Sequence, residues 1–178
     1  MQATKSSSIL IRLAHSKDRD KIIELEKSVI EHLYQKYNNS QQTVVFQQNF
    51  KVPNFNDEIA LVAEKDNQII GFASLLSNRK LVRHLYVRPQ FSHHNVASQL
   101  LAALEQEAVK KRIDILKVTS SLAERAFYNA QGYQDIAFCH LEKRDILIPA
   151  MAMQKRLSFS FNLDWLSNSL LRLRLATL

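Results

Sequence analysis

The pattern of hydrophobic and polar residues from residue 81 onwards predicts a strand, a short loop and a helix. Residues 81–87, LVRHLYV, carry apolar residues in the alternating pattern of a strand, which Pro89 ends. After a polar loop, the apolar residues recur at helical spacing, and they are Val96, Leu100, Leu101, Leu104 and Ala108. A strand, a tight turn and a helix start can direct backbone N–H groups at an anion, although an ordinary βα unit has the same pattern.

The same patterns place further strands and helices along the chain. Ser16 is the predicted N-cap of a helix that ends near residues 37–39, and residues 65–67 predict a hairpin turn. The predicted strands are 9–13, 59–64, 68–76, 81–87, 113–119, 134–142 and 145–154, and the other predicted helices are 41–50, 96–108 and 122–129.

Composition narrows the class of protein. The 178 residues suffice for one domain with a substantial core, and 46% of them are hydrophobic, which excludes a disordered chain. No run reaches the ~18 apolar residues of a membrane-spanning helix, and residues 1–8 lack the apolar core of a signal peptide. A cytoplasmic protein without a membrane partner is therefore expected. The net charge of +7 suits nucleic acid, phospholipid or a phosphorylated cofactor, and nucleic acid is disfavoured because no basic block carries interleaved aromatic residues.

Three rare residues have predicted structural roles. The single cysteine, Cys139, excludes an intrachain disulfide and is predicted to be a buried, inert thiol. Only two glycines occur, so we expect the backbone to need each of them. Gly71 lies within a predicted strand and indicates a bulge or a close backbone approach, and Gly132 is placed at the C′ position of a short helix.

Two short motifs resemble those of one known family. The first is Tyr86-Val87-x-Pro89, followed by Ser92-x-x-Asn95-x-Ala97 and a helix; the second is Phe127-Tyr128 followed by Gly132-Tyr133. Together with the order of predicted elements, they resemble motifs A and B of the GNAT (GCN5-related N-acetyltransferase) superfamily over about residues 8 to 157. In the first motif Asn95 stands where the family has a glycine, and Asn is a residue that tolerates positive φ.

The resemblance implies a fold, a cofactor and a set of binding residues. The fold is of the α/β (α+β) class, with a central mixed, mostly antiparallel sheet flanked by helices. The implied cofactor is acetyl-CoA, whose pantetheine would pair with the central strand and whose pyrophosphate would lie on the loop. The implied cofactor-binding residues are Leu85, Tyr86, Val87, Ser92, His93, His94, Asn95, Val96, Ala97 and Ser98.

Catalysis by such a protein needs a general acid and a general base. Tyr128 matches the family's catalytic tyrosine and would protonate the leaving thiolate, although the spacing alone fits a core aromatic residue. His84 alternates with Tyr86 on one strand face and would be the base, unless it is structural or merely exposed. The other carboxylate candidates for the base are Glu24, Glu31 and Glu64, and a chain of water molecules is a further alternative. No metal site is expected, because His84, His93 and His94 have no Cys or carboxylate at ligand spacing nearby.

The C-terminal segment has a pattern of its own. We divide the chain into an acetyltransferase domain, 1–156, and an amphipathic helical tail, 157–178, in which Leu163, Leu166 and Leu170 follow helical spacing. The apolar face of this tail would pack on its own domain or form a homodimer. A helix on a membrane surface would usually carry more Lys and Arg.

Three functional hypotheses follow. The leading hypothesis is an acetyl-CoA-dependent N-acetyltransferase acting on a primary amine of a small molecule or a peptide. The second is a catalytically impaired GNAT-like protein that binds CoA, because the loop lacks the family's glycine and its Arg or Gln. The third is an assembly module in which the tail matters more than the binding site. The sequence does not identify the acceptor.

Overall fold

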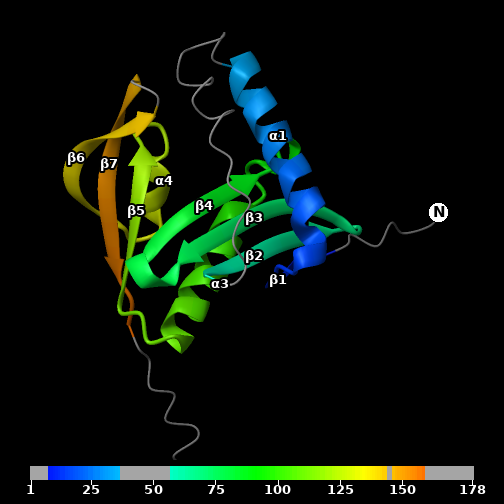
Figure 1. Ribbon diagram of the computed structural model, residues 1–178, viewed down its shortest axis with the longest axis horizontal. Coiled ribbons are helices and arrows are strands. Elements are labelled where there is room, and N and C mark those ends of the chain that lie inside the picture. The colour runs from blue at the N-terminus through cyan, green and yellow to red at the C-terminus, as the bar shows by residue number, and fades with distance from the viewer. Residues whose placement is uncertain (1–7, 37–56, 144–145, 159–178) are drawn as a thin grey trace, which may run out of the picture.

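The computed structural model describes residues 8–36, 57–143 and 146–158, which form a seven-stranded sheet with helices on both faces (Figure 1). The strand order is β1-β2-β3-β4-β5-β7-β6, and every neighbouring pair is antiparallel except β4 and β5. The predicted mixed, mostly antiparallel sheet is thus confirmed. The strands are β1 (Leu10–Leu13), β2 (Glu58–Lys65), β3 (Gln68–Leu76), β4 (Leu81–Val87), β5 (Ile115–Ser121), β6 (Gln134–Lys143) and β7 (Ile146–Arg156), and the helices are α1 (Arg19–Lys36), α3 (Val96–Lys110) and α4 (Arg125–Ala130).

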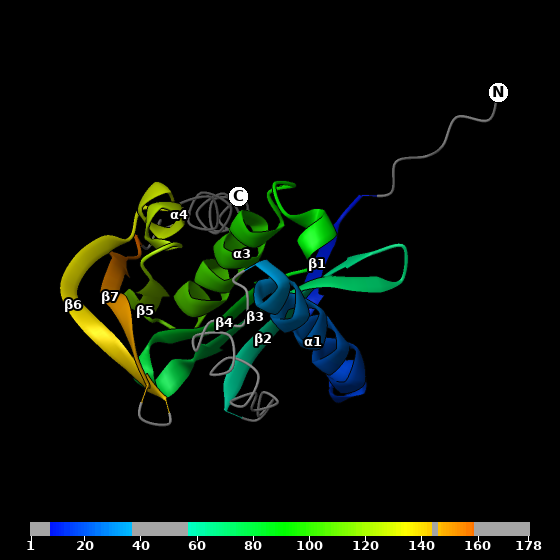
Figure 2. The same ribbon diagram turned by 90° about the horizontal axis from the view of Figure 1, so that it is seen from above.

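The two long helices cover opposite faces of the sheet (Figure 2). On one face, α1 packs Ile22 and Leu25 against Phe72 of β3. On the other face, α3 buries five apolar residues, Val96, Leu100, Leu101, Leu104 and Ala108, which are those that the helical spacing identified. Burying each large aliphatic side chain contributes roughly 1.5–3 kcal/mol to the stability of the fold. The sheet therefore lies between two stabilising apolar layers.

Gly71 of β3 lies directly against side chains of α3. A Cβ atom at residue 71 would lie 2.8 Å from Cδ1 of Leu100 and 3.0 Å from Cγ1 of Val96. The β2–β3 register also shifts opposite this position, between Ala63 and Glu64. The predicted close approach is confirmed, and a larger residue at position 71 would force the side chains of Leu100 and Val96 to shift.

Strands β4 and β5 meet at one end and then separate. Their ladder has one residue pair, Leu81 with Lys117, next to the 2.8 Å hydrogen bond that the Lys117 N–H donates to the Lys80 carbonyl. Beyond this point the two strands diverge (Figure 1). Because β3 pairs with only one edge of β4, the other edge over residues 82–87 has no strand partner in the part of the chain that the structure describes. We call this divergence the β4–β5 fork.

Several predicted boundaries were wrong for local reasons. Ser16 is not the N-cap of α1, because it begins a 3₁₀ turn, Ser16–Asp18, and α1 starts at Arg19. Strand β5 starts two residues later than predicted, because α3 ends with Arg112 at φ +59° and with the Ile113 N–H bound to the Ala108 carbonyl at 2.9 Å.

Two further predictions concern α4 and Cys139. Helix α4 starts at Arg125 instead of residue 122, because β5 continues to Ser121 and a turn follows in which the Glu124 N–H bonds the Ser121 carbonyl at 3.1 Å. Cys139 is half-buried, not buried, because it lies on β6, the outermost strand. The predicted helix 41–50 and the tail from residue 159 onwards lie outside the described residues.

Candidate functional site

Residues of β4 alternate between the two faces of the sheet at the fork. His84 and Tyr86 share a face, as predicted, and their ring centroids are 5.7 Å apart. Tyr86 packs on the α1 side of the sheet, against the cluster that contains Phe72, whereas Leu85 and Val87 pack on the α3 side. The strand therefore presents Tyr86 to one side of the fork and apolar residues to the other.

Tyr128 is held in place by the C-terminal cap of the short helix α4. Gly132 has φ +87°, its N–H bonds the Asn129 carbonyl at 3.0 Å, and the N–H of Tyr133 bonds the Tyr128 carbonyl at 3.0 Å. These two bonds form a Schellman motif, in which the C′ residue must adopt a left-handed conformation. The predicted C′ role of Gly132 is confirmed.

The ring and the hydroxyl of Tyr128 have different surroundings. The residue is only 6% exposed, and its ring packs against Phe127 and Tyr133 at centroid distances of 5.1 and 5.6 Å. The hydroxyl has no hydrogen-bond partner among the described residues, and it is not sealed from solvent as the Tyr133 hydroxyl is. Burial first, and then the charge of Glu124, raise the pKa of Tyr128, so the hydroxyl keeps its proton at neutral pH.

Two glutamates that sequence reasoning missed lie beside the tyrosines. Glu124 precedes Tyr128 by one helical turn, and its Oε2 accepts a 3.2 Å hydrogen bond from the Ser121 hydroxyl. The residue is exposed, yet enough protein surrounds its carboxyl group that desolvation raises its pKa.

The second missed glutamate, Glu26, lies on α1 and is 4% exposed. It occupies the apolar stripe that Ile22, Leu25 and Val29 form at helical spacing, and an acid in such a stripe is a signal that the sequence did contain. After burial, the charge of Glu26 and then that of Glu124 raise the pKa of Tyr86. We call Glu26, Tyr86, Glu124 and Tyr128 together the Tyr128 site; they come from α1, β4 and the start of α4.

His84 belongs to a buried polar network on the neighbouring strands. Its Nδ1 lies 2.8 Å from the Ser74 hydroxyl and 3.9 Å from Oε2 of Glu58, and the residue is 8% exposed. Glu58 in turn accepts a hydrogen bond from Arg83. This network gives His84 a structural role, because it ties β2, β3 and β4 together.

The three other predicted candidates for the base have different partners. Oε1 of Glu24 accepts a 3.0 Å hydrogen bond from Arg88, and its side chain is 69% exposed. Glu31 is exposed on α1. Glu64 lies on β2, two strands away from β4.

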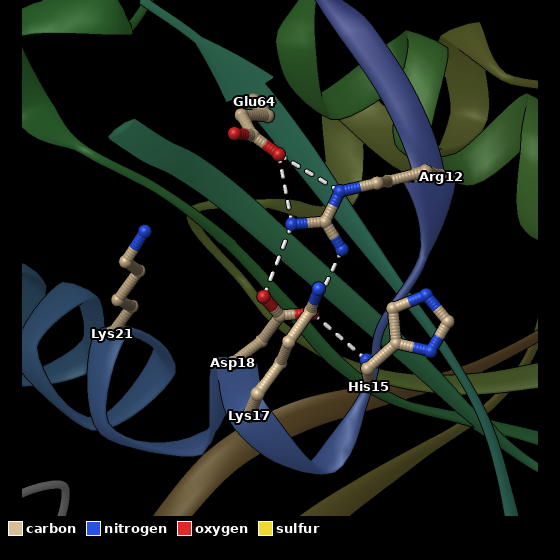
Figure 3. A pocket seen from close by; sticks show the side chains of 6 residues that line it. All are labelled: Arg12, His15, Lys17, Asp18, Lys21 and Glu64. Atoms are coloured by element: carbon tan, nitrogen blue, oxygen red, sulfur yellow. Dashed lines mark hydrogen bonds and ion pairs between the residues drawn. The ribbon is translucent and has the colours of Figure 1, made fainter. Parts of the chain in front are cut away.

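Glu64 also lines a hollow of about 370 Å³ beside β1 (Figure 3). Within it, Arg12 donates to both oxygens of Asp18, at 2.7 and 3.0 Å, and to Oε2 of Glu64 at 2.8 Å. We call these three residues the Arg12 cluster. Each acid in the cluster has its guanidinium partner, so the cluster joins β1, β2 and the turn before α1.

The predicted cofactor loop ends in a helix start with free N–H groups. Asn95 has φ +56°, as predicted, and its carbonyl accepts the Gln99 N–H at 3.0 Å. The N–H groups of Val96, Ala97 and Ser98 have no backbone acceptor among the described residues, as is usual for the first turn of a helix. The Val96 side chain is buried, so only its backbone faces the loop.

The remaining residues of this loop, Ser92, His93 and His94, are exposed. His93 has φ +67°, and Nδ1 of His94 lies 3.0 Å from the Ser92 carbonyl oxygen. The N–H groups of Ser92 and His94 bond the carbonyls of Pro89 and Phe91, at 3.0 and 3.4 Å, so the N–H groups of the first turn of α3 are those available to an anion.

The described residues contain neither a metal site nor a membrane-spanning helix. No three His, Cys, Asp or Glu side chains in this part of the chain gather so that they could hold a metal ion. No helix in the same part is long and apolar enough to cross a membrane.

Comparison with known proteins identifies the fold. It is similar to that of a GCN5-related N-acetyltransferase from Rhodopseudomonas palustris, with a TM-score of 0.74 and 22% identity over 88% of this chain and 100% of that chain. It is also similar to PaiA N-acetyltransferase from Thermoplasma acidophilum in complex with coenzyme A, with a TM-score of 0.63 and 20% identity over 84% of this chain and 99% of that one. The ribosomal-protein-S18-alanine N-acetyltransferase from Escherichia coli has a TM-score of 0.64 and 15% identity, with coverage of 87% and 97%.

No curated protein matches this chain. The family model described as "Acetyltransferase (GNAT) domain" matches residues 26–157, which is most of the chain and includes both motifs, the fork and Tyr128. The chain therefore belongs to the GNAT family of acetyltransferases.

Proposed function

We propose that this protein transfers the acetyl group of acetyl-CoA to a primary amine of a small molecule or a peptide. The observation that carries the proposal is the Tyr128 hydroxyl. The residue is only 6% exposed and its hydroxyl has no hydrogen-bond partner among the described residues, yet, unlike the unpartnered hydroxyl of Tyr133, it is not sealed from solvent. A core tyrosine normally has a partner for its hydroxyl. A tyrosine that must donate a proton to a leaving group needs its hydroxyl unoccupied until the substrate arrives.

The cofactor would bind along β4 and at the start of α3. The unpaired edge of β4, which includes Leu85, Tyr86 and Val87, offers backbone groups to the amides of the pantetheine arm. The loop from Ser92 to Asn95 and the first amides of α3 would hold the pyrophosphate. A backbone N–H on this strand edge would polarise the thioester carbonyl, as an oxyanion donor does.

Tyr128 would act as the general acid. Its raised pKa keeps the hydroxyl protonated, and a cofactor bound along β4 would bring its thioester sulfur near this hydroxyl. His84 remains a candidate base, although its bond to Ser74 makes the imidazole less available than an exposed one.

The acceptor is an amine of undetermined structure. The similar proteins include one described as a ribosomal-protein-S18-alanine N-acetyltransferase, so a peptide N-terminus is one class to test beside small amines. Identity of 15% to that protein supports the fold and not its substrate.

Two measurements test the proposal in sequence. Calorimetric titration with acetyl-CoA should give saturable binding, and a thiol-release assay with a panel of peptides and small primary amines should give acetyl-CoA turnover. Binding without turnover on any amine would favour the catalytically impaired alternative. The absence of binding would contradict both the proposed acetyltransferase and this alternative.

The C-terminal segment remains a separate prediction. Leu157 is 6% exposed and its N–H bonds the Asp114 carbonyl at 2.8 Å, so the domain includes this residue. We propose that the remaining residues form a homodimer through their leucines. Truncation after Ser158 should convert a dimer to a monomer in light scattering, and an unchanged mass would contradict the dimer.

A further inference from the structure

Glu105, Tyr133 and Lys155 make contacts that connect α3 and β7 to the end of α4. Nζ of Lys155 lies 2.7 Å from Oε2 of Glu105 and 5.7 Å from the centroid of the Tyr133 ring. A Cβ atom at Gly132 would lie 3.5 Å from Cε of Lys155, so the stem of the lysine passes over the C′ residue of α4. We call Glu105, Tyr133 and Lys155 the Lys155 cluster.

The Lys155 cluster contacts Tyr128 directly through Tyr133. The Tyr133 ring meets the Tyr128 ring edge-on, with 5.6 Å between the centroids and 72° between the planes. The backbone supplies a second connection, because the Tyr133 N–H bonds the Tyr128 carbonyl at 3.0 Å. Tyr133 is only 2% exposed, so its ring cannot move without displacing its neighbours. The orientation of Tyr128 therefore depends on Tyr133, which in turn packs against Lys155.

The cluster also includes a residue of the helix proposed to hold the cofactor. Glu105 lies on α3, whose first turn offers its free N–H groups to the pyrophosphate. Five apolar residues bury this helix against the sheet, which makes it a rigid element. The ion pair between Glu105 and Lys155 thus connects the proposed cofactor site to the cap that carries Tyr128. A displacement of ~1 Å between reacting groups can lower a rate by about 10²-fold.

Stability alone is a poor explanation for the polar groups of the cluster. Oε1 of Glu105 and the hydroxyl of Tyr133 are both buried without a hydrogen-bond partner among the described residues. A buried polar atom without a partner destabilises a fold, and apolar side chains of similar volume would fill the same space without this penalty. The geometry that the ion pair imposes is a better explanation for its presence.

We propose that Glu105 and Lys155 are positioning residues that hold Tyr133, and through its ring Tyr128, in the orientation for proton transfer to the thioester sulfur. The inference rests on the proposed function, in which Tyr128 is the general acid. It deepens that function, because it adds two residues that act through Tyr133 and not on the reactants themselves. Only the ring of Tyr133 is required, and its hydroxyl is not.

The first test removes the charge of Lys155 and keeps the shape of its stem. Lys155→Met should lower kcat by roughly 10-fold to 10²-fold, while acetyl-CoA affinity and KM for the amine stay unchanged, because only the orientation of Tyr128 is affected. Lys155→Arg should restore most of kcat, because a guanidinium can still pair with Glu105. Steady-state thiol release measures kcat and KM, and the stoichiometry of acetyl-CoA binding in calorimetry gives the concentration of folded enzyme.

Lys110→Met is the matched control. Lys110 also pairs with a glutamate of α3, Glu107, with 2.6 Å between Nζ and Oε1, but this pair lies within the helix and its lysine side chain is 69% exposed. Loss of this cation should leave kcat unchanged. A general effect of removing a positive charge beside α3 would appear in both variants.

A second test repeats Lys155→Met in a protein that already carries Tyr128→Phe. This background lacks the hydroxyl that Lys155 is inferred to position, so the second substitution should lower the residual kcat by no more than about twofold. A merely structural role would lower kcat by the same factor in both backgrounds. The comparison therefore isolates the action of Lys155 on the Tyr128 hydroxyl.

The outcomes separate this inference from the proposed function. If the wild type does not turn over, or if Tyr128→Phe is as active as the wild type, the proposed role of Tyr128 fails and the inference fails with it. If Tyr128→Phe is impaired but Lys155→Met is as active as Lys110→Met, the inference fails while the function stands. Equal losses from Lys155→Met with and without the Tyr128 hydroxyl would also overturn the inference.

Discussion

The Arg12 cluster and the Tyr128 site both contain buried or partly buried acids, but they use them in opposite ways. In the Arg12 cluster, one guanidinium serves both acids, and its hydrogen bonds lower the pKa of Asp18 to about 2. In the Tyr128 site, no described cation pairs with Glu124, and burial raises the pKa of Glu124 and of both tyrosines. The Arg12 cluster pairs its charges internally, whereas in the Tyr128 site the Tyr128 hydroxyl has no hydrogen-bond partner among the described residues.

This difference teaches which polar group to associate with function. The hollow beside β1 is the more conspicuous concavity, yet its two acids, Asp18 and Glu64, are both paired with Arg12, which holds β1 to β2 (Figure 3). The β4–β5 fork is a less conspicuous feature, because its two strands pair at one position and then separate. Ionisable groups whose pKa is raised, and which lie where two strands of the sheet separate, are the better candidates for a functional site.

Replacing Tyr128 by Phe should have the largest effect. We expect kcat to fall by roughly 10²–10⁴-fold, the range for a lost general acid, while acetyl-CoA affinity and thermal stability stay unchanged, because the hydroxyl makes no hydrogen bond within the described structure. Steady-state thiol release and calorimetry measure both quantities.

Tyr133→Phe is the matched control for this variant. The Tyr133 ring packs against that of Tyr128, but its hydroxyl is buried and unpartnered among the described residues. This variant should retain kcat. An equal loss of kcat in both variants would show that the aromatic packing, and not the Tyr128 hydroxyl, supports catalysis.

Asp18→Asn should affect stability and not catalysis. The lowered pKa of Asp18 stabilises the folded state above the unfolded value of ~3.9, and this contribution is lost as pH falls towards about 2. The shift corresponds to roughly 2 kcal/mol at neutral pH. Denaturant unfolding should therefore show the variant less stable at pH 7, with the difference shrinking in acid, while the activity of folded molecules is unchanged.

The exposed acid Asp20, in the first turn of α1, supplies the control for that measurement. Asp20→Asn should cost far less stability, since within the described part of the chain the Asp20 side chain makes no hydrogen bond or ion pair and interacts with the helix dipole. If Asp18→Asn instead lowered kcat, the Arg12 cluster would have to be reassigned to the functional site.

Changes at Asn95 should have a smaller effect, confined to the cofactor. Its φ of +56° disfavours a β-branched residue by about 1–2 kcal/mol, so Asn95→Val should weaken acetyl-CoA binding by about tenfold or somewhat more. Asn95→Gly should bind as tightly as the wild type or more tightly. Equal calorimetric affinities for all three proteins would argue against this loop as the pyrophosphate site.

Local chemistry made much of the fold predictable. Periodicity identified the buried face of α3, and the special roles of Gly71, Asn95 and Gly132 followed from the conformations that these residues tolerate. The predicted boundaries of helices and strands were less accurate. The residue type of Arg112, for example, does not indicate that this residue adopts positive φ after the end of α3. The order of elements did not by itself predict a mixed sheet. That prediction came from the resemblance to a family.

The site was less predictable, because its contacts join distant segments. The role of His84 depends on Ser74 and Glu58, which lie on other strands, and alternation along β4 could not reveal them. Glu124 was missed because the groups around it include Tyr86 of β4, which lies far away in the sequence. The Arg12 cluster likewise joins residues that are far apart in the sequence.

Hydrogen exchange with and without acetyl-CoA tests the central claim most directly, because it reports on the fork and on the Arg12 cluster in one experiment. The account predicts that acetyl-CoA slows exchange of the backbone amides at residues 82–87 and at 96–98, the unpaired edge of β4 and the first turn of α3. Amides at residues 15–21, beside the Arg12 cluster, should not change. Protection at residues 15–21 without protection at the fork would contradict the account.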